Sequence, residues 1–442
     1  MILAAAWVVF MLVAYPGLMT MDSFDQLEEA RAGFFTDSHP PAMAALWSVM
    51  DRVCSGPFGM LAIQGTAFLV GIYWILRRAM EPRSAAIVAS IVFLFPPVSA
   101  TMMAIWKDCL MAGFLVLGFA GCFDPRRWVR VLALVSFFVA TAMRYNAFAA
   151  TLPLIVLCWQ WRELPWLKRY ALALAAWFAI TIAAYGVNML LTDRQMHFWA
   201  STYALSDITG TLAHVDGSLP DTELGPLLVP TDIRVDHDFH AAVRAKYRPE
   251  TFNHLLAGEG RLWTVPISGT TPMPAARREA IEHAWREIVG GHLGAYVRYR
   301  FTCFGEVLGI HPKFQGLTVV NRTAQVPERL AANHISTTTL PLQRTGERVL
   351  VFCARKTFLF RPWMYFSLAL LLLRFTRGHR DVFALLASGI LMELSLLALA
   401  VTPDYRYSHW LVVCTCLAVA LLIARRARGI QAMPTIACPT MQ

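Results

Sequence analysis

Long apolar runs limit the fold of this chain more than any other feature, and they recur along most of its 442 residues. Several approach the roughly 20 apolar residues that a helix needs to cross the ~30 Å hydrocarbon core of a bilayer. Hydrophobic residues make up 57% of the chain and charged residues only 15%, against about 25% charged residues in soluble domains. In lipid the backbone must satisfy its own hydrogen bonds, and the alternating segments of a membrane β-barrel are missing from the sequence. The sequence therefore predicts an all-α polytopic membrane protein.

Ten transmembrane helices are predicted when each run ends at a basic residue or at a Pro or Gly break. The predicted spans are Ile2–Met19, Pro57–Leu76, Ser84–Ile105, Cys109–Phe123, Trp128–Met143, Ala147–Trp161, Tyr170–Leu191, Phe358–Leu373, Val382–Thr402 and Ser408–Ala424. A further apolar run, Ala42–Val53, is too short to cross alone and is expected at the interface or as an extension of the second helix. The first run has no basic start and no convincing cleavage site, so it is predicted to be retained.

Basic residues gather in every second linker, which sets the predicted orientation. Five linkers hold clusters of Arg and Lys: Arg77, Arg78 and Arg83; Arg126, Arg127 and Arg130; Arg162, Lys168 and Arg169; Arg374, Arg377 and Arg380; Arg425, Arg426 and Arg428. Because Lys and Arg accumulate on the cytoplasmic side, both termini are predicted to be cytoplasmic and the first acidic loop to face outward. These linkers also account for much of the net charge of +10, so nucleic acid is not an expected partner.

Three parts of the chain are predicted from the spans. They are an N-terminal transmembrane bundle over residues 1–191 with a surface helix within 20–41, an extracytoplasmic, mainly helical domain over 192–356, and C-terminal transmembrane helices with a cytoplasmic tail over 357–442. The middle part lies between the seventh and eighth predicted helices. It is about 165 residues long, which is too long for a connection without structure.

Within this middle part, Ala275–Gly309 has the pattern of two amphipathic helices broken at a Gly-Gly pair. The second helix is expected to return along the membrane surface. Cys303 and Cys353 lie on the predicted oxidising side, where they form a disulfide or remain two free thiols. "DHDFH", Asp236–His240, contains metal-ligating residue types but no third well-spaced ligand, so an ordinary loop is favoured.

Polar residues concentrate in four outward-facing turns that are distant from one another in the sequence. They are Asp22, Asp25, Asp37 and His39 in the first loop, Lys107 and Asp108 in "WKD", Arg144 and Asn146 in "RYN", and Tyr405 and Arg406 in "PDYRYSHW". Such a concentration at one interface is what a site at the membrane surface needs. Each turn also has a simpler interpretation: a solvated acidic loop, a helix cap with a snorkelling Lys, or part of an interfacial aromatic belt.

The first loop has the local pattern of a short helix lying on the membrane. Ser23 followed by Gln26 is a capping-box pattern, and Gly33 is a plausible helix end, so Phe24–Ala32 is predicted to be helical. Asp22 then lies at the junction between the first span and this surface helix. A carboxylate there is held by two rigid elements close to a positive helix terminus.

These residues together resemble the GT-C superfamily of integral membrane glycosyltransferases. The motifs "D…Q…A..G…DSHPP…W", "WKD", "RYN", "SDITG" at Ser206–Gly210 and "RY" before the last span are similar to a bacterial branch related to the dolichyl-phosphate-mannose protein mannosyltransferases. The resemblance covers most of the spans. It implies a bacterial inner-membrane protein, a sugar donor carried on a polyprenyl phosphate or diphosphate, and an extracytoplasmic active site with an essential acidic residue in the first loop.

Asp22 is the position that matches the essential acidic residue of that superfamily. The chain lacks an adjacent "DE" or "DD" pair there, which leaves Asp25 and Asp37 as alternatives for a second carboxylate. The resemblance also leaves a metal requirement open, because some branches need a divalent metal and others do not. No other cofactor is implied.

Transfer of a glycosyl group from a phosphate carrier needs a base for the acceptor proton and cations for the departing phosphate. Asp22 is the predicted base, supported by Asp25 or Asp108. One guanidinium can donate hydrogen bonds to two phosphate oxygens at once. The phosphate of the donor is therefore assigned to the Arg side chains and the Lys of these turns. His39 is expected to orient the acceptor. The predicted substrate contacts are Asp37, His39, Lys107, Arg144, Asn146, Tyr405 and Arg406.

The expected partners are a polyprenyl-phosphate sugar, membrane lipids, and an acceptor that is an envelope glycan, lipid or protein. A lipid or solute transporter or flippase without chemistry is the main alternative, and Glu393, near the middle of a predicted span, is its strongest feature. A hydrogen-bonded structural Glu explains the same residue. A membrane transferase of acyl or phosphoethanolamine groups and a purely structural subunit are the remaining alternatives.

Overall fold

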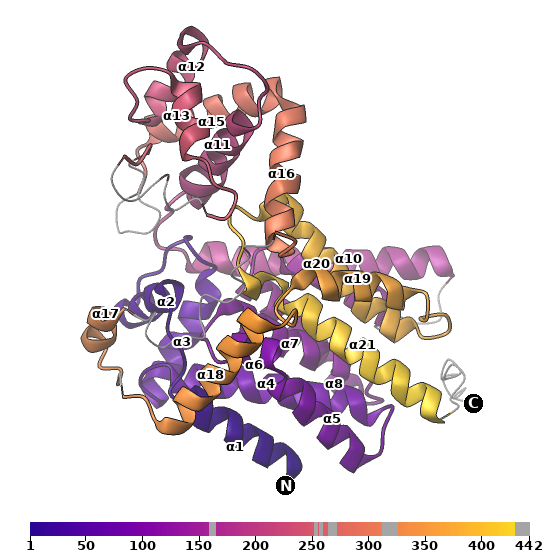
Figure 1. The fold of residues 1–442 in the computed structure, drawn as a ribbon. Coiled ribbons are helices and arrows are strands. Elements are labelled where there is room, and N and C mark those ends of the chain that lie inside the picture. Colours follow the sequence, from indigo (N-terminus) through magenta and orange to yellow (C-terminus); the bar gives the residue numbers. More distant parts are fainter. Residues whose placement is uncertain are drawn as a thin grey trace.

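The structure is a computed structural model that describes residues 1–158, 165–251, 255, 260–263, 272–311, 326–336 and 338–428. Within these residues every regular element is a helix, and β-pairing is limited to three isolated bridges. The predicted all-α class is confirmed for this described part of the chain. Figure 1 shows a bundle of apolar helices with a second group of helices standing above it.

The bundle contains the apolar helices of both halves of the chain. They are α1 (Ile2–Ala14), α4 (Phe58–Arg77), α5 (Pro82–Leu94), α6 (Pro96–Met102), α7 (Lys107–Gly121), α8 (Arg127–Met143), α9 (Ala147–Pro153), α10 (Trp166–Leu191), α19 (Pro362–Leu373), α20 (Arg380–Leu399) and α21 (His409–Arg428). Glycines allow the central helix α7 to approach its neighbours closely: a Cβ at Gly71 would lie 2.7 Å from Val116 Cγ2, and one at Gly118 2.6 Å from Phe137 Cε1.

Among the residues that the structure describes, four helices are long and apolar enough to cross a membrane: Phe58–Arg77, Trp166–Leu191, Arg380–Leu399 and Tyr405–Ala427. The run predicted as one span over Ser84–Ile105 is divided, because α5 and α6 meet at 67° where Pro96 follows Phe95. Counted as one broken span, this pair makes five. Three shorter apolar helices add Ile2–Ala14, Ala147–Leu157 and Pro362–Leu373. A helix thus lies at each predicted place, and the number of ten spans stays a prediction.

Helix α2 (Met21–Ala32) follows the first apolar helix and starts earlier than the sequence pattern indicates. Its N-cap is Thr20, whose backbone N–H donates to Ser23 Oγ at 3.1 Å. Ser23 was predicted to be the N-cap residue. In the structure it is the third residue of the helix, the N3 position of the capping box. The predicted end is confirmed, because Gly33 has a left-handed φ of 62° that favours glycine.

Helix α3 (Pro41–Val53) is a separate element that packs on α2. The residue before a proline is pushed out of helical geometry, so Pro40 and Pro41 keep the preceding segment extended and start the helix afresh. The Ala42–Val53 run is thus not an extension of the second apolar helix.

A second group of helices stands above the bundle (Figure 1). It consists of η2 (Trp199–Ala204), α11 (Leu205–Ala213), α12 (Asp221–Leu228), η3 (Val229–Thr231), α13 (Phe239–Lys246), α15 (Ala275–Gly291) and α16 (Leu293–Val307). Its members bury a core of their own around Ile208, Trp263 and Ile281. Val307 of α16 packs on Leu396 of α20 and so joins this group to the bundle.

The break between two amphipathic helices predicted for Ala275–Gly309 is confirmed by α15 and α16. The expected return of the second helix along the membrane surface stays a prediction. α16 rises from α20 into the upper group, and Arg300 is buried on it, where its Nη2 lies 2.7 Å from Asp207 Oδ1 of α11. Cys303 and Cys353 are both free thiols.

"DHDFH" has a structural role in the upper group of helices. Asp238 caps α13 by accepting the Ala241 N–H at 3.1 Å. His240 is buried and accepts the Leu219 N–H at Nδ1, while its Nε2 lies 2.8 Å from the Leu212 carbonyl oxygen. Among the described residues no group of three or more His, Cys, Asp or Glu side chains is arranged to hold a metal ion.

Gly210 of "SDITG" is expected to tolerate no side chain, because a Cβ there would lie 2.2 Å from the Tyr299 ring of α16. Over-packing of this kind costs about 1–3 kcal/mol of folding free energy. We therefore expect Gly210→Ala to lower the melting temperature of the purified protein. The matched control is Gly290→Ala, since nothing lies within 4 Å of a Cβ at Gly290. Equal melting temperatures for the two variants would contradict the close contact.

The chain returns to the bundle through α17 (Pro327–Ala332) and α18 (Pro341–Lys356). Arg329 of α17 pairs with Glu28 of α2 at 2.6 Å, so this short helix is attached to the first-loop helix. α18 crosses the bundle and packs on α1 and α6.

The two ends of the bundle carry different charge arrangements. At one end Asp381 of α20 accepts from Arg425 of α21 at 2.9 Å and lies 3.7 Å from Arg78, just after α4. This end contains three of the basic linkers predicted to be cytoplasmic. The polar turns assigned to the outward side lie at the opposite ends of these same helices. The direction of the bundle relative to the membrane stays a prediction.

Candidate active site

Four turns that are distant in sequence meet at the end of the bundle opposite Asp381. They are the start of α2, the segment before α3, the start of α7, and η5 (Tyr405–Ser408) just before α21. Each is the point where a helix begins or a loop enters one, so backbone N–H groups and polar side chains gather there. The turn between α8 and α9 adds Arg144 and Asn146 beside them.

Asp22 lies at the centre of this group, in the first turn of α2. Its Oδ2 is 2.7 Å from Arg406 Nη1 and its Oδ1 is 3.9 Å from His39 Nε2. The side chain is 27% exposed, so solvent or a substrate reaches it. Burial by itself would raise the pKa of Asp22, but Arg406, His39 and Lys107 together hold that pKa well below its ordinary value. The carboxylate therefore stays ionised at neutral pH.

His39 connects Asp22 to Lys107. Lys107 Nζ lies 2.8 Å from His39 Nδ1, on the opposite side of the imidazole ring from Asp22. Burial lowers the pKa of His39 to about 3, and the charge of Lys107 acts in the same direction. The ring is thus neutral at physiological pH. When Lys107 donates to Nδ1, the remaining ring proton is on Nε2, which faces the Asp22 carboxylate.

Arg406 is held by contacts on several sides. Besides Asp22, its Nε lies 3.0 Å from Asp404 Oδ2. Its guanidinium carbon is 4.8 Å from the centre of the Trp106 ring and 5.3 Å from that of Tyr407. Two carboxylates and two aromatic faces leave this cation little freedom, which preorganises it to receive a further anion.

Asp108 and Arg144 form a buried ion pair next to this group. Arg144 also donates from Nε to Asn146 Oδ1 at 2.8 Å, and Asn146 donates to Ser395 Oγ of α20 at 2.8 Å. The guanidinium carbon of Arg144 lies 4.8 Å from the centre of the Tyr407 ring, which Arg406 also faces. The structure therefore places Asp108 as the partner of Arg144 and gives it no contact with Asp22.

The other acidic residues of the first loop contact different partners. Asp25 lies 2.8 Å from Arg329 Nη2 of α17, and Asp37 accepts the backbone N–H of Met196. In the described part of the chain neither forms an ion pair or hydrogen bond with Asp22. Burial raises the pKa of Asp25, although Arg329 acts in the opposite direction.

Tyr405 does not contact the group around Asp22. Its ring is buried against Phe360 at 5.0 Å between ring centres, within the hydrophobic core. Successive residues of the tight η5 turn point in different directions, so Tyr407 and not Tyr405 reaches the two guanidinium groups. Three further residues around these cations were not predicted as substrate contacts: Tyr407, Trp106 and Asp404. Each is next to or close to a predicted cation in "WKD" or "PDYRYSHW".

Glu393 is fully buried on α20 and accepts a hydrogen bond from Ser408 Oγ at 2.8 Å. This hydrogen bond joins α20 to the η5 turn. The structural interpretation of Glu393 fits this arrangement better than a binding residue in a transport path does.

Comparison with protein-family models and with curated proteins found no match. Among solved structures, the chain is similar to ArnT from Cupriavidus metallidurans, whose crystal structure has undecaprenyl phosphate bound. The two chains are 15% identical, the alignment covers 97% of this chain and 78% of that one, and the TM-score is 0.35. The function of this chain is therefore inferred from its own residues.

Proposed function

We propose that this chain is a membrane glycosyltransferase that moves a sugar from a polyprenyl-phosphate donor to an acceptor hydroxyl at the end of the bundle that holds Asp22. One observation carries the proposal. An ionised, partly exposed carboxylate lies 2.7 Å from a preorganised guanidinium, at the end of a bundle of membrane helices. A base beside a fixed cation at the end of a membrane bundle suits a substrate whose phosphate lies at the bilayer surface.

The proposed reaction is a single displacement at the anomeric carbon of the sugar. The acceptor oxygen attacks that carbon while the bond from the carbon to the phosphate oxygen breaks, and the bonding electron pair leaves with the phosphate. Asp22 takes the proton of the acceptor hydroxyl. Attack on the face opposite the leaving phosphate inverts the configuration of the sugar.

Arg406 has two roles in this scheme because it is shared between Asp22 and the donor. The incoming phosphate shares the fixed guanidinium with Asp22, since one guanidinium can donate to two phosphate oxygens through parallel N–H groups. Asp22 then loses part of the attraction that lowers its pKa and becomes a stronger base when the donor is bound. Donor binding and proton removal are thereby coupled through one side chain.

The remaining groups hold the phosphate and the acceptor. Arg144 adds positive charge and is kept in place by its buried ion pair with Asp108. Burial lowers the pKa of Lys107 to about 7, so Lys107 adds positive charge in its protonated form. Neutral His39 donates from Nε2 and orients the carboxylate or the acceptor hydroxyl. No step in this scheme depends on a metal ion.

A lipid-linked donor also explains the location of the site. The polyprenyl tail stays in the hydrocarbon beside the helices, while the sugar reaches the helices that stand above the bundle. We assign this end to the outer face of a bacterial inner membrane, with both termini cytoplasmic, and the acceptor to an envelope glycan, lipid or protein. The three-part division at residues 191 and 356 belongs to the same proposal.

The proposal is tested with the purified chain in liposomes containing a polyprenyl phosphate that carries a radiolabelled sugar. Membranes from a strain that lacks this chain supply the acceptor. We expect label to move to the acceptor and sugar-free polyprenyl phosphate to form. Arg406→Ala should reduce the rate about 10²–10³-fold, the usual effect of removing one group that stabilises the transition state. Arg83→Ala, at the other end of the bundle, is the matched control.

The transporter alternative gives a different result in the same liposomes. A flippase moves the intact sugar-lipid between leaflets, which an impermeant oxidant of sugars detects, and it does not cleave the bond to phosphate. Movement without cleavage would refute the enzyme proposal.

A further inference from the structure

Helix α18 crosses the end of α1 on the side of the bundle where Asp22 lies. Gln343 donates from Nε2 to the Tyr15 carbonyl oxygen at 2.7 Å, one residue after α1 ends. A Cβ at Gly346 would lie 2.6 Å from Val13 Cγ1, so the two helices touch. α18 also packs on α6, the last part of the broken span. In Figure 1 α18 starts near the end of the first apolar helix and runs obliquely in front of the bundle toward α6.

The side chains of α18 form three faces. Gln343 and Leu350 are buried against the bundle. One exposed flank is apolar, and its residues are Leu342, Val349 and Phe352, at 49%, 52% and 62% exposure. The other flank is basic and repeats at helical spacing through Arg344, Arg348 and Arg355. A helix with an apolar flank beside a basic one is suited to the boundary between acyl chains and headgroups and is poorly suited to water.

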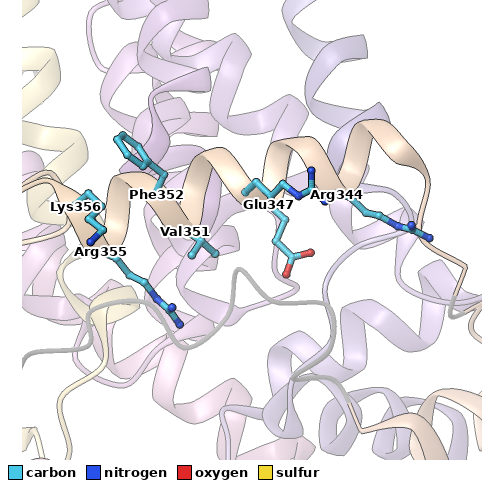
Figure 2. Close-up of a pocket in the computed structure, with 7 residues that line it drawn as sticks. Arg344, Glu347, Val351, Phe352, Arg355 and Lys356 are labelled. Atoms are coloured by element: carbon cyan, nitrogen blue, oxygen red, sulfur yellow. The ribbon is translucent and has the colours of Figure 1, made fainter.

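The basic flank carries more basic than acidic side chains. Glu347 is the one acidic residue in the sequence of α18. In the part of the chain that the structure describes, Arg344, Arg348 and Arg355 have no ion pair. The three line a groove of ≈ 430 Å³ together with Glu347, Val351, Phe352 and Lys356. Figure 2 shows Arg344 and Arg355 at the two ends of this row and Phe352 on the other side of the helix.

We propose that α18 lies in the membrane interface and binds the phosphate headgroup of an anionic phospholipid with Arg344, Arg348 and Arg355. The apolar flank enters the acyl region, which removes Leu342, Val349 and Phe352 from water. The headgroup phosphate supplies the negative charge that the basic flank lacks, and Arg pairs with phosphate oxygens through two parallel hydrogen bonds. Charge complementarity and the exposed apolar flank together select a lipid over a soluble anion, which would leave that flank in water.

Native mass spectrometry of the full chain in detergent tests this site. The chain is titrated with dioleoyl phosphatidylglycerol, with phosphatidylcholine and with undecaprenyl phosphate. The test variant is the triple change Arg344→Gln, Arg348→Gln and Arg355→Gln. The matched control removes the same charge from exposed positions between Trp199 and Val307, Arg234→Gln, Arg261→Gln and Arg286→Gln. We expect the test variant to bind phosphatidylglycerol at least about tenfold more weakly and the control to be unchanged.

Each alternative occupant gives a distinct result. Unchanged phosphatidylglycerol binding in the test variant overturns the proposal, and so does a loss confined to undecaprenyl phosphate, which would assign the groove to the sugar carrier. If the triple variant does not fold, Phe352→Glu replaces it, and we expect the same weakening. Sugar transfer is not measured here, so failure of the proposed enzyme activity leaves this test intact.

Discussion

The Asp22→Asn variant is expected to lose sugar transfer by about 10²–10⁴-fold, the contribution of a positioned general base. An amide keeps the size of the side chain and can still accept a hydrogen bond from Arg406, but it cannot take the acceptor proton. The loss should therefore appear in kcat, because the cations that hold the donor phosphate remain. The measurement is label transfer from the polyprenyl-phosphate sugar, with protein amounts in the membrane matched by immunoblot.

Asp25→Asn is the matched control, one helical turn away on α2. Asp25 pairs with Arg329 and has no contact with Asp22, so we expect less than a tenfold change in rate. A comparable loss in both variants would show that a second carboxylate takes part in the reaction. Normal turnover in Asp22→Asn, with normal protein amounts, would remove Asp22 from the mechanism.

The second large effect is expected on stability, from Asp108→Ala. Asp108 is 1% exposed and is the ion-pair partner of Arg144, so its removal leaves a buried guanidinium without its counter-charge. Breaking a buried pair in this way costs about 3–5 kcal/mol. Thermal unfolding of the purified protein in detergent should show a large fall in melting temperature.

The matched control breaks an exposed ion pair by Asp216→Ala. Its partner Arg298 lies 2.8 Å away at the surface of the upper helices. Exposed pairs contribute about 0–1 kcal/mol, so the melting temperature should hardly move. The double variant Asp108→Leu with Arg144→Met should recover part of the stability, because no unpaired charge is left. Equal melting temperatures for Asp108→Ala and Asp216→Ala would mean that Asp108 is not a buried partner.

Local sequence patterns predicted the helices well. Apolar runs and Pro, Gly or basic breaks act within a few residues, and a helix forms at each predicted span. The same holds for Gly33, whose left-handed φ ends α2, and for the Gly-Gly pair between α15 and α16. The error at the start of α2 is also local. Thr20 and Ser23 both carry hydroxyls that cap a helix, and the sequence does not choose between them.

The sequence predicted that the polar turns lie at one end of the bundle. The number of spans and the charge of the linkers determine at which end of the bundle each turn lies. Asp22, His39, Lys107 and Arg406 lie together for that reason. α18 was not predicted from the sequence, because its apolar flank is narrow and interrupted by arginines. Its role becomes visible only from its position against the end of α1.

What the sequence determined by itself is the class of the protein, the position of most helices and the end of the bundle to which each polar turn belongs. Only the tertiary structure decided which side chains pair: Asp108 with Arg144, Asp25 with Arg329, and Tyr407 in place of Tyr405 beside the two guanidinium groups. Apolar periodicity and helix breaks act over one or two turns of chain. An ion pair between residues far apart in sequence depends on how the helices pack against one another. Local sequence patterns do not predict that packing.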